Sequence, residues 1–151
     1  PHRQKLFCDD CHTRDMTARS IARRLLGAFL LFAGLSHLFW ARSTFRAQVP
    51  GWLPLDVDLV VVASGVVEIA LGLALITLTR HRVVVGWVVA AFLVAVFPGN
   101  VSQLVTHTDA FGLDSDLARW LRLPFQPLLI VWALWSTDAW RRRPRRARMD
   151  A

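Results

Sequence analysis

Four polar side chains interrupt apolar segments of this chain, and their residue types are those that can exchange protons or bind polar groups. Glu68 is the one ionisable residue in LVVVASGVVEIALGLALITLT, residues 59–79. His37 lies in AGLSHLFW, Asn100 in FPGNVSQL and Gln126 in RLPFQP. Polar groups in a lipid-facing sequence usually turn towards the protein interior and pair there.

Two interpretations of these four residues stay open. In the first, they line a pocket that binds a small, polar-headed, lipid-soluble molecule or relays protons, with Ser64 as structural polar support. In the second, they only clamp helices together by hydrogen bonds, as polar residues in membranes often do. Catalytic residues are not assigned.

A second group of reactive side chains, Cys8, Cys11 and His12, lies in FCDDCH near the N-terminus. C-x-x-C-H is the attachment pattern of c-type haem, but haem of this type is attached outside the membrane, and we expect this segment inside. Half of a zinc site and a redox dithiol are further alternatives. The simplest interpretation is two reduced thiols in a tail that folding does not need, and we expect no resident metal.

The segments that carry the first four residues have the length and composition of membrane spans. Hydrophobic residues make up 54% of the 151 residues, and charge collects in short basic blocks between apolar runs. A helix of about 20 residues crosses the bilayer, and nothing here alternates as barrel strands do. The sequence predicts an all-α four-transmembrane-helix bundle with spans at about 21–41, 59–79, 83–105 and 123–140. Residues 1–20 would form a flexible cytoplasmic tail, and residues 141–151 a basic one.

The arginines predict the orientation of this bundle. They concentrate before residue 25, at Arg80 and Arg82, and in RRRPRRAR at 141–148, whereas the other two connections balance arginine with aspartate. With four crossings, all three basic regions lie on one side, which the positive-inside rule assigns to the cytoplasm. Basic residues that flank spans meet lipid headgroups, so we expect no nucleic-acid partner.

Depth in the membrane brings the polar residues together. Counted at 1.5 Å per residue, His37 lies about 7 Å and Glu68 about 15 Å below the outer edge. Because side chains tilt towards the N-terminus of their helix, His37 and Glu68 converge, and so do Asn100 and Gln126. We expect Glu68 within hydrogen-bond or one-water reach of His37, with Asn100 or Gln126 next to them.

Small residues and a proline also mark the spans. Gly27, Gly34 and His37 share one face of the first span, and Ser64, Glu68 and Gly72 share one face of the second. Small residues let helices approach closely in lipid. Pro98, before Gly99, should kink or end the regular third helix.

The order of LFAGLSHLF, VPGWLP, ASGVVEIALGLAL, VFPGNV and LRLPFQPLLIVWALW resembles the DoxX-like bacterial membrane proteins, over about residues 25–140. The resemblance implies a four-helix bundle in the bacterial cytoplasmic membrane, and polar positions inside the bilayer at His37, Glu68, Asn100 and Gln126. Some members of that family are subunits of quinone-coupled sulfur oxidoreductases, and others are linked to thiol-redox complexes. The predicted spans contain no cysteine, which favours quinone contact or partner docking over thiol exchange.

The sequence therefore leaves a choice of functions. The first is a membrane subunit or partner of a quinone-linked or thiol-redox oxidoreductase system, with a quinone as ligand and soluble redox proteins as partners on the cytoplasmic side. The alternative is a non-catalytic membrane scaffold that anchors soluble partners. A transporter ranks last, because no pseudo-repeat and no second acidic residue in the spans supports one.

Overall fold

The computed structural model describes the backbone of residues 2–106, 120 and 123–140, and side chains within these ranges from residue 15 onward. The described part is helical, and none of it forms a strand. Its elements are α1 (His2–Phe39), α2 (Arg42–Arg46), α3 (Val57–Thr77), the 3₁₀ turn η1 (Thr79–His81), α4 (Arg82–Val105) and α6 (Phe125–Ser136).

Three helical stretches of the described residues are long and apolar enough to cross a membrane: Asp15–Phe39, Val57–Thr77 and Thr79–Val105. Each buries less than half of its most apolar window inside the protein, so most of that apolar window lies on the outside of the bundle. The helix that contains the first stretch begins at His2, with no break at residue 20 where we expected a tail to end. α6 has 12 residues, or about 18 Å at 1.5 Å per residue, and is shorter than the fourth span we expected at 123–140.

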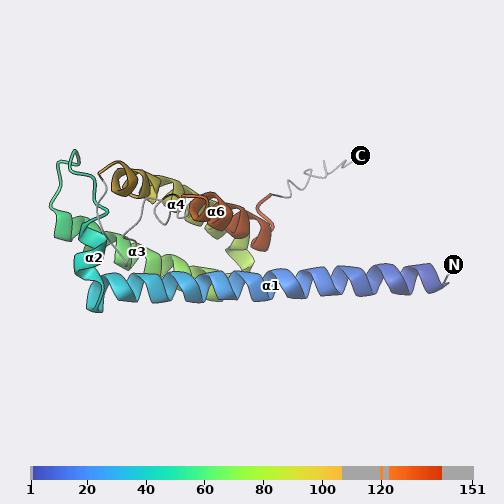
Figure 1. Ribbon diagram of the computed structural model, residues 1–151. Helices are drawn as coiled ribbons and strands as arrows, with labels where there is room; N and C mark the ends of the chain where they lie inside the picture. The colour runs from blue at the N-terminus through green and yellow to red at the C-terminus, as the bar shows by residue number, and fades with distance from the viewer. Residues whose placement is uncertain (1, 107–119, 121–122, 141–151) are drawn as a thin grey trace, which may run out of the picture.

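The chain runs back and forth between two ends of the bundle (Figure 1). We call one the α2 end, where Arg42 lies 3.3 Å from Asp58 across the first connection. We call the other the Asp138 end, where Asp138 lies 2.6 Å from Arg19 of α1 and 2.8 Å from Arg82 of α4. Asp138, two residues after α6, thus lies at the same end of the bundle as Arg19 of α1 and Arg82 of α4.

One apolar core joins α1, α3, α4 and α6. Its buried members are large aliphatic side chains and one alanine: Leu26, Leu30, Leu75, Val85, Val89, Leu93 and Ala133. Every one of the four helices supplies at least one of them, so α6 belongs to the bundle despite its length. The core lies between the Asp138 end and the middle of the bundle.

Helices α1 and α3 touch through glycines at two crossings. A Cβ atom built on Gly34 would lie 2.5 Å from the carbonyl oxygen of Gly65, and one built on Gly27 would lie 2.8 Å from that of Gly72. No side chain fits at such separations, so only glycine allows this backbone contact. The seven-residue spacing is the same on both helices because two helical turns take about seven residues.

Local interactions fix where the helices begin and end. The side chain of Asp56 accepts a hydrogen bond of 2.9 Å from the backbone N–H of Leu59 and caps the start of α3. α4 continues through Pro98 to Val105, so the proline does not end this helix. α6 ends where Thr137 turns its hydroxyl back to the carbonyl of Ala133, at 2.6 Å, and where Asp138 takes a left-handed backbone conformation with φ 60°.

Candidate functional site

His37 and Glu68 face each other across the α1–α3 interface. The His37 Nε2 atom lies 3.6 Å from Oε2 of Glu68, and the two side chains are 8% and 13% exposed. This separation exceeds that of a hydrogen bond, and Glu68 Oε2 is buried with no hydrogen-bond partner in the described structure. The predicted proximity of the two residues is confirmed. It leaves one carboxyl oxygen free to bind something else.

The other ring nitrogen of His37 is held by α3. His37 Nδ1 lies 3.1 Å from Ser64 Oγ and 3.4 Å from the carbonyl oxygen of Val61. Ser64 donates its own hydroxyl hydrogen to that carbonyl at 2.9 Å, so it accepts from the imidazole, and Nδ1 is the nitrogen that carries hydrogen. In neutral histidine the lone pair is then on Nε2, which faces Glu68. Nε2 and the Glu68 carboxyl group are therefore two proton-accepting groups that face each other without a hydrogen bond between them.

Close packing fixes the His37 ring in this position. A Cβ atom on Gly65 would lie 2.8 Å from Cβ of His37, so the Gly34–Gly65 crossing lies directly beside the histidine. On the side of the α2 end, the ring of Phe45 lies with its centroid 3.4 Å from that of His37, tilted by 36°. The histidine is therefore enclosed between a backbone contact and an aromatic ring.

Asn100 and Gln126 form a second polar pair, between α4 and α6. The Asn100 amide donates to Gln126 Oε1 at 2.9 Å, and Gln126 Nε2 donates to the carbonyl oxygen of Leu93 at 2.7 Å. Pro98 removes the N–H that would pair with the next carbonyl, that of Val94. The predicted convergence of Asn100 and Gln126 is confirmed. Their hydrogen bonds join α4 to α6, and their place beside Glu68 stays a prediction.

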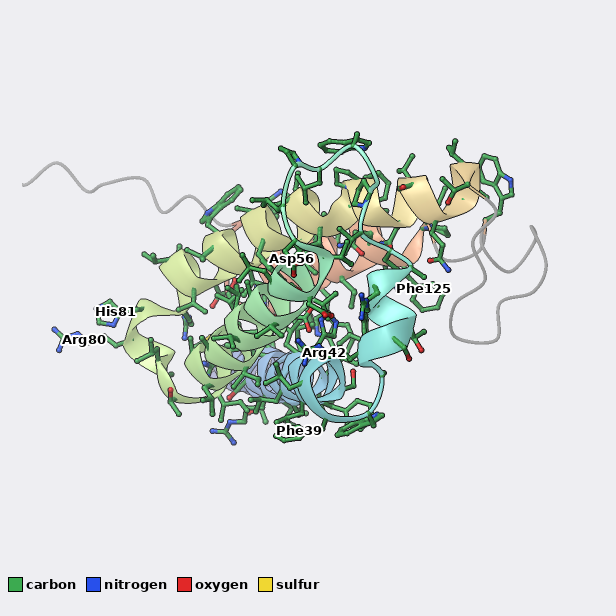
Figure 2. All side chains as sticks on the ribbon, turned by 90° about the vertical axis from the view of Figure 1, so that its left-hand side faces the viewer. Phe39, Arg42, Asp56, Arg80, His81 and Phe125 are labelled. Carbon is green, nitrogen blue, oxygen red and sulfur yellow. The ribbon has the colours of Figure 1, made fainter. Side chains whose placement is uncertain are left out.

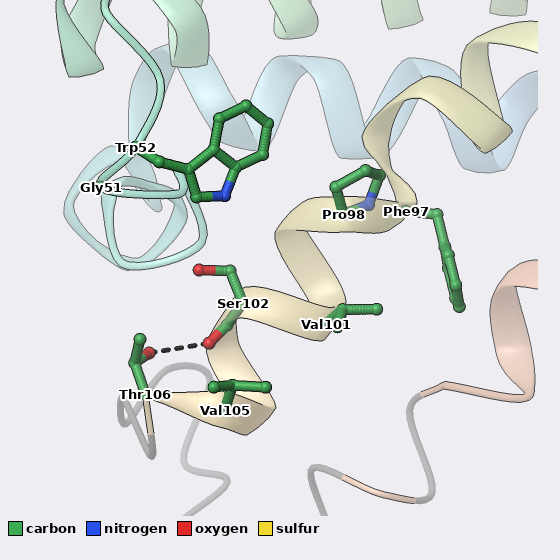
Figure 3. A pocket seen from close by; sticks show the side chains of 8 residues that line it. All are labelled: Gly51, Trp52, Phe97, Pro98, Val101, Ser102, Val105 and Thr106. Carbon is green, nitrogen blue, oxygen red and sulfur yellow. Dashed lines mark hydrogen bonds between the residues drawn. The ribbon is translucent and has the colours of Figure 1, made fainter.

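An apolar groove of about 640 Å³ opens near the α2 end (Figure 3). Gly51 and Trp52 border one side of it, and the last turns of α4 form the other, with Phe97, Pro98, Val101, Ser102, Val105 and Thr106. The Thr106 hydroxyl donates to the carbonyl of Ser102 at 2.8 Å, and most of the other side chains that line the groove are apolar. None of the four predicted site residues lines it.

Sequence reasoning missed the buried arginines. Arg23, counted among the basic residues that set the orientation, is 2% exposed and donates to the carbonyl of Leu75, one of the last carbonyls of α3. Arg19 binds Asp138 and the carbonyl of Trp135, and its guanidinium carbon lies 5.3 Å from the Trp135 ring centroid. Their acceptors are 52 to 119 residues away in the chain, so no local pattern indicates these contacts.

The cysteine motif is not described at the level of side chains. Cys8, Cys11 and His12 lie on the first turns of α1, in the part whose side chains fall outside the described residues. Among the residues that are described, no three His, Cys, Asp or Glu side chains converge as metal ligands would. The haem, zinc and dithiol alternatives for this motif stay predictions.

Residues 26–137 match a family model described as "Domain of unknown function (DUF8561)". The chain belongs to this family. Neither a curated protein nor a solved structure matches it. The matched range begins at Leu26 and ends at Thr137, so it contains all four polar residues, both glycine crossings and the apolar core, and it leaves out the cysteine motif and the arginine-rich tail. Nothing in this match links the chain to the DoxX-like proteins, so that resemblance stays a prediction.

Proposed function

We propose that the chain is a multi-pass protein of the bacterial cytoplasmic membrane in which α6 and its flanking residues form a fourth crossing. In this arrangement the Asp138 end faces the cytoplasm and the α2 end faces outward. Two observations support it: the basic residues concentrate on the connections of the Asp138 end, and Asp138 returns to Arg19 and Arg82. The side chains of Trp52 and Trp140 are 71% and 65% exposed, and in this arrangement they would lie at the two membrane–water interfaces, where tryptophan is enriched.

Within this membrane protein, we propose that His37 and Glu68 bind the polar ring of a quinone-type ligand and exchange protons with it, as part of an oxidoreductase system. The observation that carries the proposal is the buried Glu68 Oε2 atom, which has no hydrogen-bond partner and lies 3.6 Å from His37 Nε2. A buried acceptor without a partner is costly, and the hydroxyl of the reduced ligand, a quinol, would donate to it. A bound quinone supplies two-electron, two-proton redox chemistry, and Ser64 keeps the proton-binding nitrogen of His37 turned towards it.

The groove supports a ligand that has an apolar chain as well as a polar ring. The chain segment that places Phe45 against His37 continues through Gln48 to Gly51 and Trp52, which border the groove. The backbone N–H of Gln48 donates to the carbonyl of Phe45 at 3.0 Å, and the Gln48 carbonyl lies 2.9 Å from where a Cβ on Gly99 would be. One short segment thus borders both regions, so a head at His37 and a chain in the groove would belong to one molecule.

Binding of a decyl-substituted benzoquinol, whose ring hydroxyls can donate to Glu68 Oε2, to the purified protein tests this proposal. We expect Glu68→Gln to weaken binding about tenfold or more, because a buried hydrogen bond to a charged group contributes about 1.5–3 kcal/mol. Thr77→Val is the matched control, since the Thr77 hydroxyl on the same helix bonds only to the carbonyl of Leu73 in the described structure. Equal affinities of wild type and Glu68→Gln, or no binding by the wild type, would contradict the proposal.

A scaffold function is the second candidate, because several buried polar groups act as structural clamps. Asn100 and Gln126 are paired with each other, and Asp138 is paired with two arginines. At the Asp138 end, Arg80 and His81 stand clear of the helices and could meet a soluble partner (Figure 2). If Glu68 were only such a clamp, Glu68→Gln would be tolerated and Glu68→Ala would cost about 1–2 kcal/mol of stability.

A further inference from the structure

The helix α2 packs at its end of the bundle against α3 through ion pairs and against α1 through an aromatic contact. It has five residues, none of them buried, and a helix of this length is not stable alone. Arg42 Nε lies 3.3 Å from Asp58 Oδ1, and Arg46 Nη1 lies 3.4 Å from Asp58 Oδ2. Between these two arginines, Phe45 points to the His37 ring. An aspartate at the start of α3 and a ring contact with α1 therefore help to position this element.

Towards the Asp138 end, the α1–α3 interface beyond His37 is closed. The Gly34–Gly65 crossing comes first, and its backbones approach too closely for a water molecule to pass between them. The Gly27–Gly72 crossing follows one heptad later, and then the core side chains Leu26 and Leu75, both 0% exposed. Arg23 closes this path by bonding to the carbonyl of Leu75.

The α2 side of His37 lacks such a barrier. Phe45 covers the ring, but its helix is fixed by ion pairs whose side chains are 38–54% exposed, and exposed ion pairs are weak and screened by salt. A buried polar atom near this cover, Gln48 Nε2, has no hydrogen-bond partner in the described structure, and Asp58 Oδ1 meets Arg42 as an ion pair without a hydrogen bond. These features describe a cover that can move, in contrast to the closed glycine crossings.

We infer that α2 is the cover of the His37–Glu68 site, and that the site exchanges protons and water only with the α2 end of the bundle. The Arg42–Asp58 and Arg46–Asp58 ion pairs, which we call the latch, hold α2 in place, and α2 keeps the Phe45 ring over His37. This inference rests on the proposed function only in treating His37 and Glu68 as the reactive pair. It assigns the site a side of the membrane and names four residues that control access to it.

Cysteine labelling in proteoliposomes tests the inference without any ligand or turnover. In a Cys8→Ser/Cys11→Ser background, Ser64→Cys places a thiol next to His37, and Ser43→Cys marks the side on which α2 lies. A membrane-impermeant, positively charged methanethiosulfonate is added to one side at a time. We expect Ser64→Cys to react slowly, and only from the side that labels Ser43→Cys. Reaction from the opposite side would overturn the inference.

The latch is tested in the same assay. Arg42→Gln with Arg46→Gln should raise the labelling rate of Ser64→Cys about tenfold, because two exposed ion pairs shift an opening equilibrium by about one order of magnitude. Arg24→Gln with Arg80→Gln is the matched control, since these exposed arginines lie at the other end and should leave the rate within about twofold. Raising the salt concentration should speed labelling of the protein with its latch intact, which gives a test that needs no further substitution.

An unchanged rate in the latch variant and at high salt would refute the cover, and so would the absence of labelling in every variant. Failure of the proposed function would look different. In that case decyl-benzoquinol would not bind, while the sidedness and latch dependence of labelling would stay as described.

Discussion

Replacing Gly34 by alanine adds one methyl group at the tightest point between α1 and α3. The new Cβ would lie 2.5 Å from the Gly65 carbonyl oxygen, 2.8 Å from Cγ1 of Ile69 and 3.0 Å from the Ile69 backbone nitrogen. Two of these three atoms belong to the backbone and cannot rotate away. Ordinary contact begins near 3.4 Å, so the helices must separate by about 1 Å, a large change in a close-packed interior.

The magnitude follows from two opposing effects. Overpacking of this kind costs about 1–3 kcal/mol, whereas alanine is favoured over glycine inside a helix by about 1 kcal/mol. Separation also moves His37 away from Ser64, because Gly65 packs directly against the histidine. We therefore expect Gly34→Ala to lower the free energy of unfolding by about 1–2 kcal/mol.

Reversible unfolding of the purified protein in mixed micelles, followed by circular dichroism, measures this change. Gly51→Ala is the control, because no atom lies within 4 Å of a Cβ built there, and we expect it to be neutral. The double variant Gly34→Ala/Gly65→Ala should lower the free energy of unfolding by less than the sum of the two single changes, since both push apart the same two backbones at one crossing. A Gly34→Ala protein as stable as the wild type would show that the two backbones do not touch, and would refute the packing argument.

Three further predictions concern the ends of the bundle and its second polar pair. Asp138→Asn should destabilise the protein by about 1–3 kcal/mol in the same unfolding assay, because two arginines lose a charged acceptor; no change would mean that these ion pairs do not hold α6. Gln126→Leu should cost about 1–3 kcal/mol through the loss of two hydrogen bonds between helices, and a neutral effect would exclude it as a clamp. A reporter active only outside the cytoplasm should work when fused at Trp52 and be silent at Ala151, and the reverse result would invert the proposed orientation.

The sequence predicted those parts of the structure that follow from composition and helical geometry. The lengths of the apolar runs located the three long spans, to within a few residues at the ends that are bounded by turns. Depth in the membrane and side-chain tilt predicted that His37 lies near Glu68 and Asn100 near Gln126. Both arguments need only the rise per residue and the direction of Cβ. They work because a membrane gives every helix a common reference plane.

The rest depended on contacts between distant parts of the chain. Nothing local shows that Arg23 caps α3 or that Asp138 joins α1 to α4. α6 ends at Ser136, before the predicted span does, because Thr137 bonds back to the helix and Asp138 is left-handed. The role of α2 could not be predicted either, since a five-residue helix in a connection has no periodicity to read.

The spacing of the glycines leaves the alignment of α1 against α3 undecided. Sliding one helix by seven residues, about 10 Å, would bring Gly27 against Gly65 and keep one of the two crossings. The polar contacts at the two ends of this hairpin remove the ambiguity: Arg23 meets the end of α3 in one alignment, and Arg42 and Arg46 meet Asp58 in the same one. The glycines thus decide how near the two helices lie, and the arginines decide which residues become neighbours when the hairpin assembles.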